Sequence, residues 1–336
     1  GVDHDRVQRH MEGYAHLAAV AAPWTPERTS KATGVSAATL REMVTAYLAA
    51  DGAALYCSTG VNQGRYGVMV FWLQEAINAI TGNLDRRGGV LAGRNVIPRP
   101  AVATDPQHSR IADIPYVNST IPAGIMADEI LTPGEGKVRA MINMAGNPLL
   151  SCAGSERLAQ AFEDLELLVC MDIVRNETAE YADYILPGLH GLERPDIPFY
   201  FFTVMGLMPE RSFTYTEPVL PPPGLARDEG LVLRQLCRLA GRPLAGSRLL
   251  QWLSNTSEAL SKLPGMGRRS SLDRAFFSLL TRSAKIGGLG KLRNNPDGIL
   301  LAPNQPGDYL GQRVATPSGK VQLAPADLLQ RAATLE

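Results

Sequence analysis

The sequence predicts an α/β fold in which parallel or mixed sheets are covered by helices. Three observations lead to this prediction: short apolar runs alternate with amphipathic helical segments, turns rich in glycine follow the apolar runs, and the alternation occurs in both halves of the chain. The 336 residues suffice for about two domains of about 150 residues each. In open α/β domains of this kind, ligands bind at the carboxyl ends of the strands.

The first half predicts a helix, a strand, a glycine turn and a second helix. Apolar side chains at helical spacing predict a helix over 36–48, with Ser36 as its N-cap. The run 53–57 is short and apolar, as expected of a buried strand, and 66–80 again has helical periodicity. The segment 88–121 is rich in proline and arginine without a clear period, and we expect an extended loop there.

The second half predicts a β-α-β-α-β unit, which is typical of a parallel sheet. Its elements are a strand at 138–143, a helix at 156–162, a strand at 167–171, a short helix at 177–182 and a strand at 184–186. After a proline run, helical patterns follow at 229–240, 249–263 and 272–283. The segment 316–323 reads as a turn that enters a strand.

Composition excludes several classes of function. Lysine plus arginine and aspartate plus glutamate number 33 each, so the chain has no net charge with which to attract nucleic acid. No apolar run reaches the ~20 residues of a membrane-spanning helix. The four cysteines lie far apart, without the close pairs that seat zinc or an iron–sulfur cluster. The chain opens without methionine or a targeting segment, and we expect it to be part of a longer protein.

The stretch from Ala145 to Pro148 follows a predicted strand and precedes a predicted helix. Gly146 allows close backbone approach, and the helix that begins after Asn147 offers free N–H groups to a phosphate. The stretch therefore suits a pyrophosphate, although a simple strand-to-helix turn would give the same pattern.

Acidic residues follow the next strands. Asp172 comes directly after an apolar strand, where its carboxylate can accept from a ribose hydroxyl or from the N–H groups of guanine; alternatively it caps the next helix. Glu177 and Thr178 would open that helix. Glu193 and Arg194 lie a few residues beyond the following strand, again at the predicted ligand edge, unless they form a solvated ion pair.

A further candidate loop lies in the first half, from Thr59 to Gly64. It contains Gly60, Asn62 and Gln63 and lies between a predicted strand and a predicted helix. Two amide side chains and flexible glycines suit recognition of a heteroaromatic ring or its phosphate, and a plain polar loop is the alternative.

Taken together and in order, these segments resemble the molybdopterin oxidoreductases of the dimethyl sulfoxide reductase superfamily, which includes formate dehydrogenases and nitrate reductases. The resemblance covers most of the chain up to about Gly241 and resumes near Thr316. The segments that carry it are Trp24–Glu27, Thr33–Val35, Thr59–Gln63, Ile80–Leu84, Gly146–Pro148, Asp172, Glu177–Ala179, Ala182–Asp183, Leu186–Pro187, Glu193 and Thr316–Lys320.

The resemblance implies a molybdenum or tungsten ion held by two molybdopterin guanine dinucleotides. It implies that Thr59, Gly60, Asn62 and Gln63 lie near the pterins, and that residues of the second half contact a nucleotide arm. The implied nucleotide contacts are Gly146, Asn147, Met171, Asp172, Glu177, Thr178 and Arg194, with Asp228 or Glu229 in addition.

The resemblance also implies a division of the chain. It gives the second part of an αβα pterin-binding domain at 1–135, a doubly wound guanine-dinucleotide-binding domain at 136–245, a helical insertion at 246–315 and the start of a C-terminal barrel at 316–336. The family's iron–sulfur cysteines and its metal-ligating residue would lie upstream, so we assign no metal ligand or catalytic residue here. After Arg194 the chain departs from many members, which leaves the substrate open.

The expected function is two-electron oxidoreduction, by oxygen-atom transfer or formate-type oxidation, in which the cofactor does the chemistry. We expect a small-molecule substrate, an electron-transfer partner and a cytoplasmic location. The alternative is a structural or electron-carrying subunit like the large iron–sulfur subunit of respiratory complex I, which has the fold without the pterin. A nicotinamide-binding domain is disfavoured because no G-x-G-x-x-G follows a strand.

Overall fold

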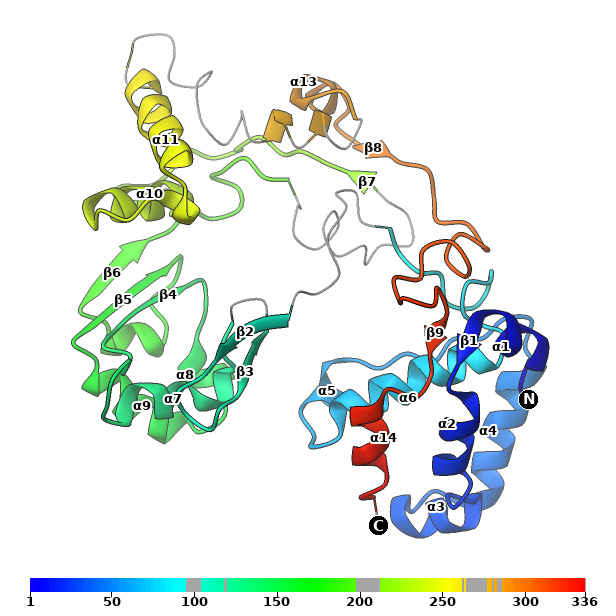
Figure 1. The fold of residues 1–336 in the computed structure, drawn as a ribbon. Helices are drawn as coiled ribbons and strands as arrows, with labels where there is room; N and C mark the ends of the chain where they lie inside the picture. The colour runs from blue at the N-terminus through cyan, green and yellow to red at the C-terminus, as the bar shows by residue number, and fades with distance from the viewer. Residues whose placement is uncertain are drawn as a thin grey trace. The chain divides into compact units, whose positions relative to one another are not determined.

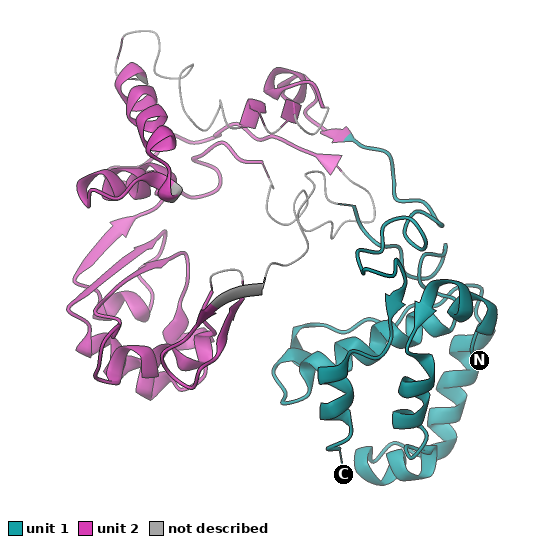
Figure 2. Cartoon of the chain, in the orientation of Figure 1, with its two compact units in different colours: residues 1–96, 201–211, 300–336 teal, residues 97–200, 212–299 magenta. Residues whose placement is uncertain are grey.

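The computed structural model describes residues 1–94, 104–117, 120–197, 212–261, 263, 277–279, 281–282 and 286–335. The chain forms two compact units, shown in different colours in Figure 2. The first unit consists of residues 1–96, 201–211 and 300–336, and the second of 97–200 and 212–299. Within the described parts, no helix is both long enough and apolar enough to cross a membrane.

The first unit is mainly helical. Its elements are α1 (His4–His10), β1 (Met11–Glu12), α2 (Tyr14–Ala21), α3 (Pro26–Thr33), α4 (Ala37–Ala49), α5 (Thr59–Asn62), α6 (Gly67–Ile80), β9 (Val321–Gln322) and α14 (Ala326–Ala332) (Figure 1). The predicted helices at 36–48 and 66–80 are confirmed as α4 and α6. The hydroxyl of Ser36 accepts from the N–H of Thr39 and so caps α4, as predicted.

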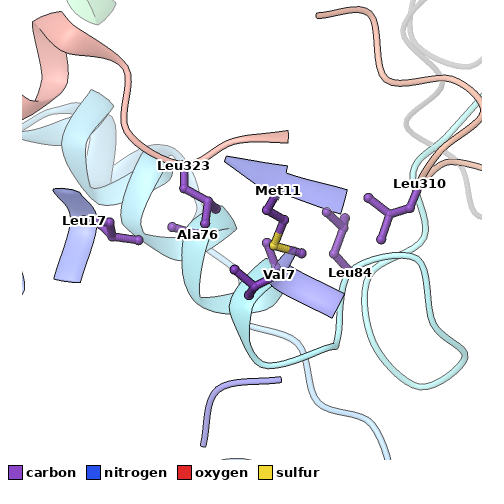
Figure 3. Packing of buried hydrophobic residues seen from close by; sticks show 8 residues of the cluster. Val7, Met11, Leu17, Ala76, Leu84, Leu310 and Leu323 are labelled. Carbon is purple, nitrogen blue, oxygen red and sulfur yellow. The ribbon is translucent and has the colours of Figure 1, made fainter. Parts of the chain in front are cut away.

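The core of the first unit joins the two ends of the chain. Buried residues of α1, α2 and α6 pack with Leu310 and Leu323 from the last forty residues (Figure 3). The predicted turn and strand after Thr316 are also present: strand β9 pairs in parallel with β1, with Met11 opposite Val321. The indole Nε1 of Trp72 donates to the carbonyl of Leu323 at 2.9 Å. The segment 316–335 thus folds with the N-terminal helices.

The predicted strand at 53–57 is wrong for this structure. The segment is extended, but amide side chains from helix α6 and the turn after it take the place of a neighbouring strand. Asn78 accepts from the N–H of Leu55 at 2.9 Å and donates to its carbonyl at 3.2 Å, while Asn83 accepts from the N–H of Ala53 at 3.1 Å. These three backbone groups of Ala53 and Leu55 are thereby satisfied without a sheet.

The second unit is built on a three-stranded parallel sheet, and the predicted β-α-β-α-β unit is confirmed. The strands are β4 (Ala140–Met144), β5 (Leu167–Asp172) and β6 (Tyr184–Pro187), in the order β4-β5-β6. Helices α8 (Pro148–Ser151), α9 (Ser155–Asp164) and the 3₁₀-helix η2 (Thr178–Tyr181) connect them. Strand β5 contributes Leu168 and Cys170 to a core that it shares with α9 and α7 (Met126–Leu131).

Part of the predicted loop 88–121 is regular structure. Strands β2 (Thr104–His108) and β3 (Pro115–Val117) form an antiparallel hairpin, and η1 (Ala123–Ile125) leads into α7. Arg110, just after β2, pairs with the buried Glu129 of α7 at 2.9 Å and donates to two carbonyls of that region. This ties the hairpin to the sheet, in the compact unit that includes residues 97–200. The domain boundary at residue 136 that the resemblance implies stays a prediction.

Further elements of the second unit, among its described residues, are β7 (Ser212–Phe213), α10 (Glu229–Leu239), η4 (Leu244–Gly246), α11 (Arg248–Ser261) and α13 (Leu289–Arg293). Strand β8 (Ile299–Leu300) begins at the last residue of this unit. The predicted helices at 229–240 and 249–263 are confirmed as α10 and α11. The predicted helix at 272–283 lies largely outside the described residues; 277–279 and 281–282 are helical.

Candidate functional site

The carboxyl ends of the three parallel strands bring the predicted second-half residues together. Ala145 follows β4, and its N–H donates to the carbonyl of Met171 at the end of β5 at 2.9 Å. The N–H of Gly188, after β6, donates to the carbonyl of Asp172 at 3.0 Å. Ala145 has a φ of +49°, a backbone conformation that side chains disfavour and that concentrates at functional sites.

The carboxylate of Asp172 is half-buried and held in place from both sides. Its Oδ1 accepts from the N–H of Ile173 at 2.7 Å, and its Oδ2 accepts from the side chain of Asn176 at 3.0 Å. It does not cap a helix, since the N-cap of η2 is Glu177. A carboxylate has about four lone-pair positions, so Asp172 keeps capacity to accept from a ligand.

Asn147 is the centre of a network that joins the turn after β4 to η2. Its Nδ2 donates to Glu177, and its Oδ1 accepts from the Thr178 hydroxyl at 2.8 Å and from the Thr178 N–H at 3.3 Å. A hydrogen bond from its own backbone, followed by the bond from Asn147, lowers the pKa of Glu177. Thr178 is 0% exposed, so it cannot contact a ligand itself; its hydrogen bonds to Asn147 hold that side chain in position. Met171 is also buried and contributes packing and its carbonyl.

The expected helix N-terminus after Asn147 does not offer free N–H groups. Helix α8 is a single turn, its first residue Pro148 has no N–H, and the N–H of Leu149 donates to the Thr178 hydroxyl at 3.1 Å. The N–H groups of Leu150 and Ser151 both donate to the carbonyl of Asn147. These three donors are used within the protein, so the expectation that they are free for a phosphate is wrong; a phosphate site at Gly146 and Asn147 stays a prediction.

Arg194 and Glu229, predicted separately, form an ion pair of 2.7 Å. Arg194 does not pair with its neighbour Glu193, which instead accepts from the N–H of His190 at 3.0 Å. The Nε of Arg194 is buried and has no hydrogen-bond partner among the residues that the structure describes. Asp228 caps α10 by accepting from the N–H of Leu231 at 2.9 Å. Of the two acidic alternatives, Glu229 is thus the one connected to the site.

Little space is left for a side chain at Gly188, beside this pair. A Cβ added at Gly188 would lie 3.2 Å from Oε1 of Glu229, closer than ordinary van der Waals contact. Gly188 also aligns in parallel with Arg227, just before α10. The start of α10 therefore approaches the strand end closely enough to bring Glu229 and Arg194 to the same edge as Asp172.

The first predicted loop belongs to the other compact unit. Thr59, Gly60 and Asn62 form the short helix α5, and Gln63 follows it; all four are exposed. The structure therefore leaves this surface accessible in the first unit. Within the described residues, no group of three histidine, cysteine, aspartate or glutamate side chains is arranged to hold a metal ion.

Sequence reasoning missed two asparagines that shape the sheet edge. Asn176 donates to Gly146 O at 3.2 Å as well as to Asp172, and its own oxygen accepts from the N–H of Ala179. Asn143, buried in β4, donates to Gly146 O at 2.8 Å. The signal available was the presence of amide side chains inside or beside apolar strands, where they need internal partners.

The parallel sheet and its polar carboxyl edge define an open α/β protein, a class in which ligands bind at the carboxyl ends of the strands. A family model described as molybdopterin oxidoreductase matches residues 8–239 of this chain. The chain belongs to the molybdopterin oxidoreductase family, within the dimethyl sulfoxide reductase superfamily.

Known relatives agree with this assignment. Formate dehydrogenase H of Escherichia coli is 29% identical over 231 residues, which cover 63% of this chain and 32% of that protein. F420-dependent formate dehydrogenase 1 subunit alpha of Methanococcus maripaludis is 27% identical over 208 residues, covering 57% of this chain and 31% of that protein. These matches span about a third of the length of either relative.

The fold is shared with acetylene hydratase from Pelobacter acetylenicus. The TM-score is 0.71 at 19% identity, and the match covers 98% of this chain and 46% of that one. At this identity the likeness concerns the fold, and it confirms the α/β architecture predicted from the sequence.

Proposed function

We propose that this chain is part of an oxidoreductase that uses molybdenum or tungsten bound by two molybdopterin guanine dinucleotides. In the proposal, the second unit holds one guanine dinucleotide arm at the carboxyl edge of β4, β5 and β6. The observation that carries the proposal is the half-buried carboxylate of Asp172, fixed by Ile173 and Asn176 with accepting capacity left over. Membership of the family supports the choice of cofactor.

The polar groups of the edge fit a guanine nucleotide. Asp172 is an acceptor, as guanine N–H groups or ribose hydroxyls require. The buried Nε of Arg194 is a donor that has no partner within the described part of the chain, as a phosphate or carbonyl oxygen requires. Its partner Glu229 orients the guanidinium. When bound, the cofactor would supply two-electron redox chemistry, by oxygen-atom transfer or formate-type oxidation.

The residues of this chain would bind and orient the nucleotide arm. In the proposal, Asp172 accepts from it, Arg194 compensates its negative charge, and Asn147, Glu177 and Thr178 hold the turn after β4 in shape. Thr59, Gly60, Asn62 and Gln63 are proposed to face the pterins from the first unit. An iron–sulfur cluster and the metal-ligating side chain are proposed for parts of the protein outside this chain, together with an electron-transfer partner, a small-molecule substrate and a cytoplasmic location.

The test is metal and nucleotide analysis of the complete protein, purified from its native host. We expect roughly two GMP per molybdenum or tungsten after acid hydrolysis, because each pterin carries one guanine nucleotide. Substitution Asp172→Ala should lower the GMP recovered per protein, since the guanine or ribose donors lose their acceptor. The matched control Asp164→Ala removes an exposed carboxylate, paired with Lys137, from the end of α9.

The outcomes separate the two functions. A protein with neither metal nor GMP would overturn the proposal and favour the electron-carrying subunit related to complex I. If the Asp172→Ala variant contains as much GMP as the parent protein, the proposed cofactor stands but Asp172 is not one of its contacts.

A further inference from the structure

A basic hollow lies between helices α10 and α11, away from the sheet edge described above. It has a volume of about 320 Å³ and is lined by both helices and by the residues that connect them. The lining residues that matter here are Arg238, Arg242, Arg248 and Trp252. Neither the proposed cofactor contacts nor the core uses these side chains.

The charged side chains around the hollow are almost all positive. From residue 230 to 257 the sequence contains four arginines and no aspartate or glutamate. Of the three that line the hollow, Arg238 reaches the carboxylate of Glu258 at 3.4 Å. Arg242 and Arg248 are exposed and have no acidic partner among the residues that the structure describes. Guanidinium groups left unpaired in this way match carboxylates or phosphates.

The same surface is also apolar. The indole of Trp252 is 61% exposed, and Leu239, Leu249 and Leu253 of the same two helices are exposed as well. Leu249 lies three residues before Trp252 and four before Leu253, so it adjoins both of them on the surface of α11. Tryptophan and arginine are the residues that most often dominate protein–protein interfaces.

We propose that this surface is a docking site for an acidic, apolar segment of a partner protein. Carboxylates of the partner would pair with Arg242 and Arg248, and its apolar side chains would cover Trp252 and the neighbouring leucines. A small phosphate compound would use the arginines alone, whereas the exposed leucines beside them need an apolar ligand of greater extent. Charge complementarity of this kind sets the rate and specificity of association. The proposal does not depend on which cofactor the protein carries.

The test uses the complete protein and a fluorescein-labelled amphipathic peptide with leucines along one face and glutamates along the other. Anisotropy should give saturable binding that weakens at least about tenfold between low and high salt, since exposed charge pairs are screened. The double substitution Arg242→Glu with Arg248→Glu should weaken binding by at least about tenfold. Trp252→Ala should also weaken binding but leave the salt dependence in place.

A matched control reverses the same number of charges elsewhere. Lys31 in α3 and Arg331 in α14 are exposed and form no ion pair with the described residues, and Lys31→Glu with Arg331→Glu should leave the peptide affinity unchanged. Equal binding of a peptide with the same residues in scrambled order, or equal loss in the control, would refute the proposal. Displacement of the peptide by GMP would indicate a small-anion site. Self-association of the protein that disappears in the arginine variant would indicate a second copy as the occupant.

Discussion

The polar side chains at the sheet edge differ in whether their hydrogen-bonding groups are used within the protein. Thr178 and Asn176 use their polar atoms inside the protein, whereas Asp172 and Arg194 retain hydrogen-bonding capacity. The sequence predicted the strand ends and the position of Asp172 at the end of β5, because a carboxylate after an apolar strand is a local pattern. It could not predict that Arg194 pairs with Glu229, since the two are 35 residues apart and meet only through the fold.

Cys170 offers a test of burial at the scale of one residue. It is 1% exposed, and burial raises the pKa of its thiol, with the charge of Asp172 adding to the effect and a hydrogen bond from Asn143 opposing it. A thiol reacts as the thiolate, so we expect Cys170 to be alkylated only after unfolding. The half-buried Cys57, Cys152 and Cys237 should react in the native protein. Mass spectrometry of protein alkylated at neutral pH measures the extent of alkylation at Cys170 and at the three half-buried cysteines.

The raised pKa also has a consequence for stability. The neutral thiol is favoured in the fold, so on raising the pH the unfolded chain loses its proton first, near the ordinary value of 9.0. The contribution of Cys170 is therefore present below that pH and is lost above it, as the pH rises toward the folded pKa. Unfolding free energy should fall more steeply above 9.0 in the parent than in Cys170→Ala. Parallel pH profiles, or alkylation of Cys170 in the native protein, would contradict this reasoning.

At the scale of elements, patterns with a clear period were predicted well. Helices α4, α6, α10 and α11 and strands β4, β5 and β6 all follow from apolar spacing. The hairpin of β2 and β3 was missed because it contains a proline and lacks alternation, and its place depends on the contact of Arg110 with Glu129. The segment 53–57 has the composition of a strand. A β-strand also needs a second strand to pair with, and the sequence of the segment alone does not predict whether one is present.

Asn78 is the residue that substitutes for that neighbour. It is 0% exposed, and its side chain bonds the N–H and carbonyl of Leu55 and accepts from the hydroxyl of Tyr47. Asn78→Ala would leave these buried groups unpaired and should lower the unfolding free energy by about 2–3 kcal/mol. Urea denaturation measures the change. Asn62→Ala, at an exposed position of the same unit, should change it by less than about 0.5 kcal/mol, and an equal loss in both variants would argue against a role for the network.

At the scale of the whole molecule, the first unit is assembled from distant parts of the sequence. Asp85, which is buried, accepts from the N–H groups of Tyr309 and Leu310 at 3.1 and 2.9 Å, and Arg313 donates to the carbonyls of Ala92 and Gly93. These contacts span more than two hundred residues of sequence. No local pattern predicts these contacts. In the structure β9 pairs with β1, and the expectation that 316–336 begins a barrel domain stays a prediction.

The two compact units have separate hydrophobic cores, which leads to a prediction about cooperativity. Leu323 is buried in the first core, against residues of α1, α2 and α6, and the second core lies between the sheet and α7 and α9. Leu323→Ala should cost about 2–5 kcal/mol, because truncating a buried leucine removes apolar contacts and leaves a cavity. The loss should be confined to the first unit, since Leu323 packs within the core of that unit.

Hydrogen exchange read by mass spectrometry resolves this at the level of elements. Amides of α1 and α6 should exchange faster in Leu323→Ala, while those of β4 and β5 keep their rates. The complementary substitution Leu168→Ala, in the core of the second unit, should reverse the pattern. If either substitution accelerates exchange in both units equally, the units unfold together and the two cores stabilise one cooperative structure. If each affects its own unit alone, residues of the first and last segments form an independently stable body around Leu323.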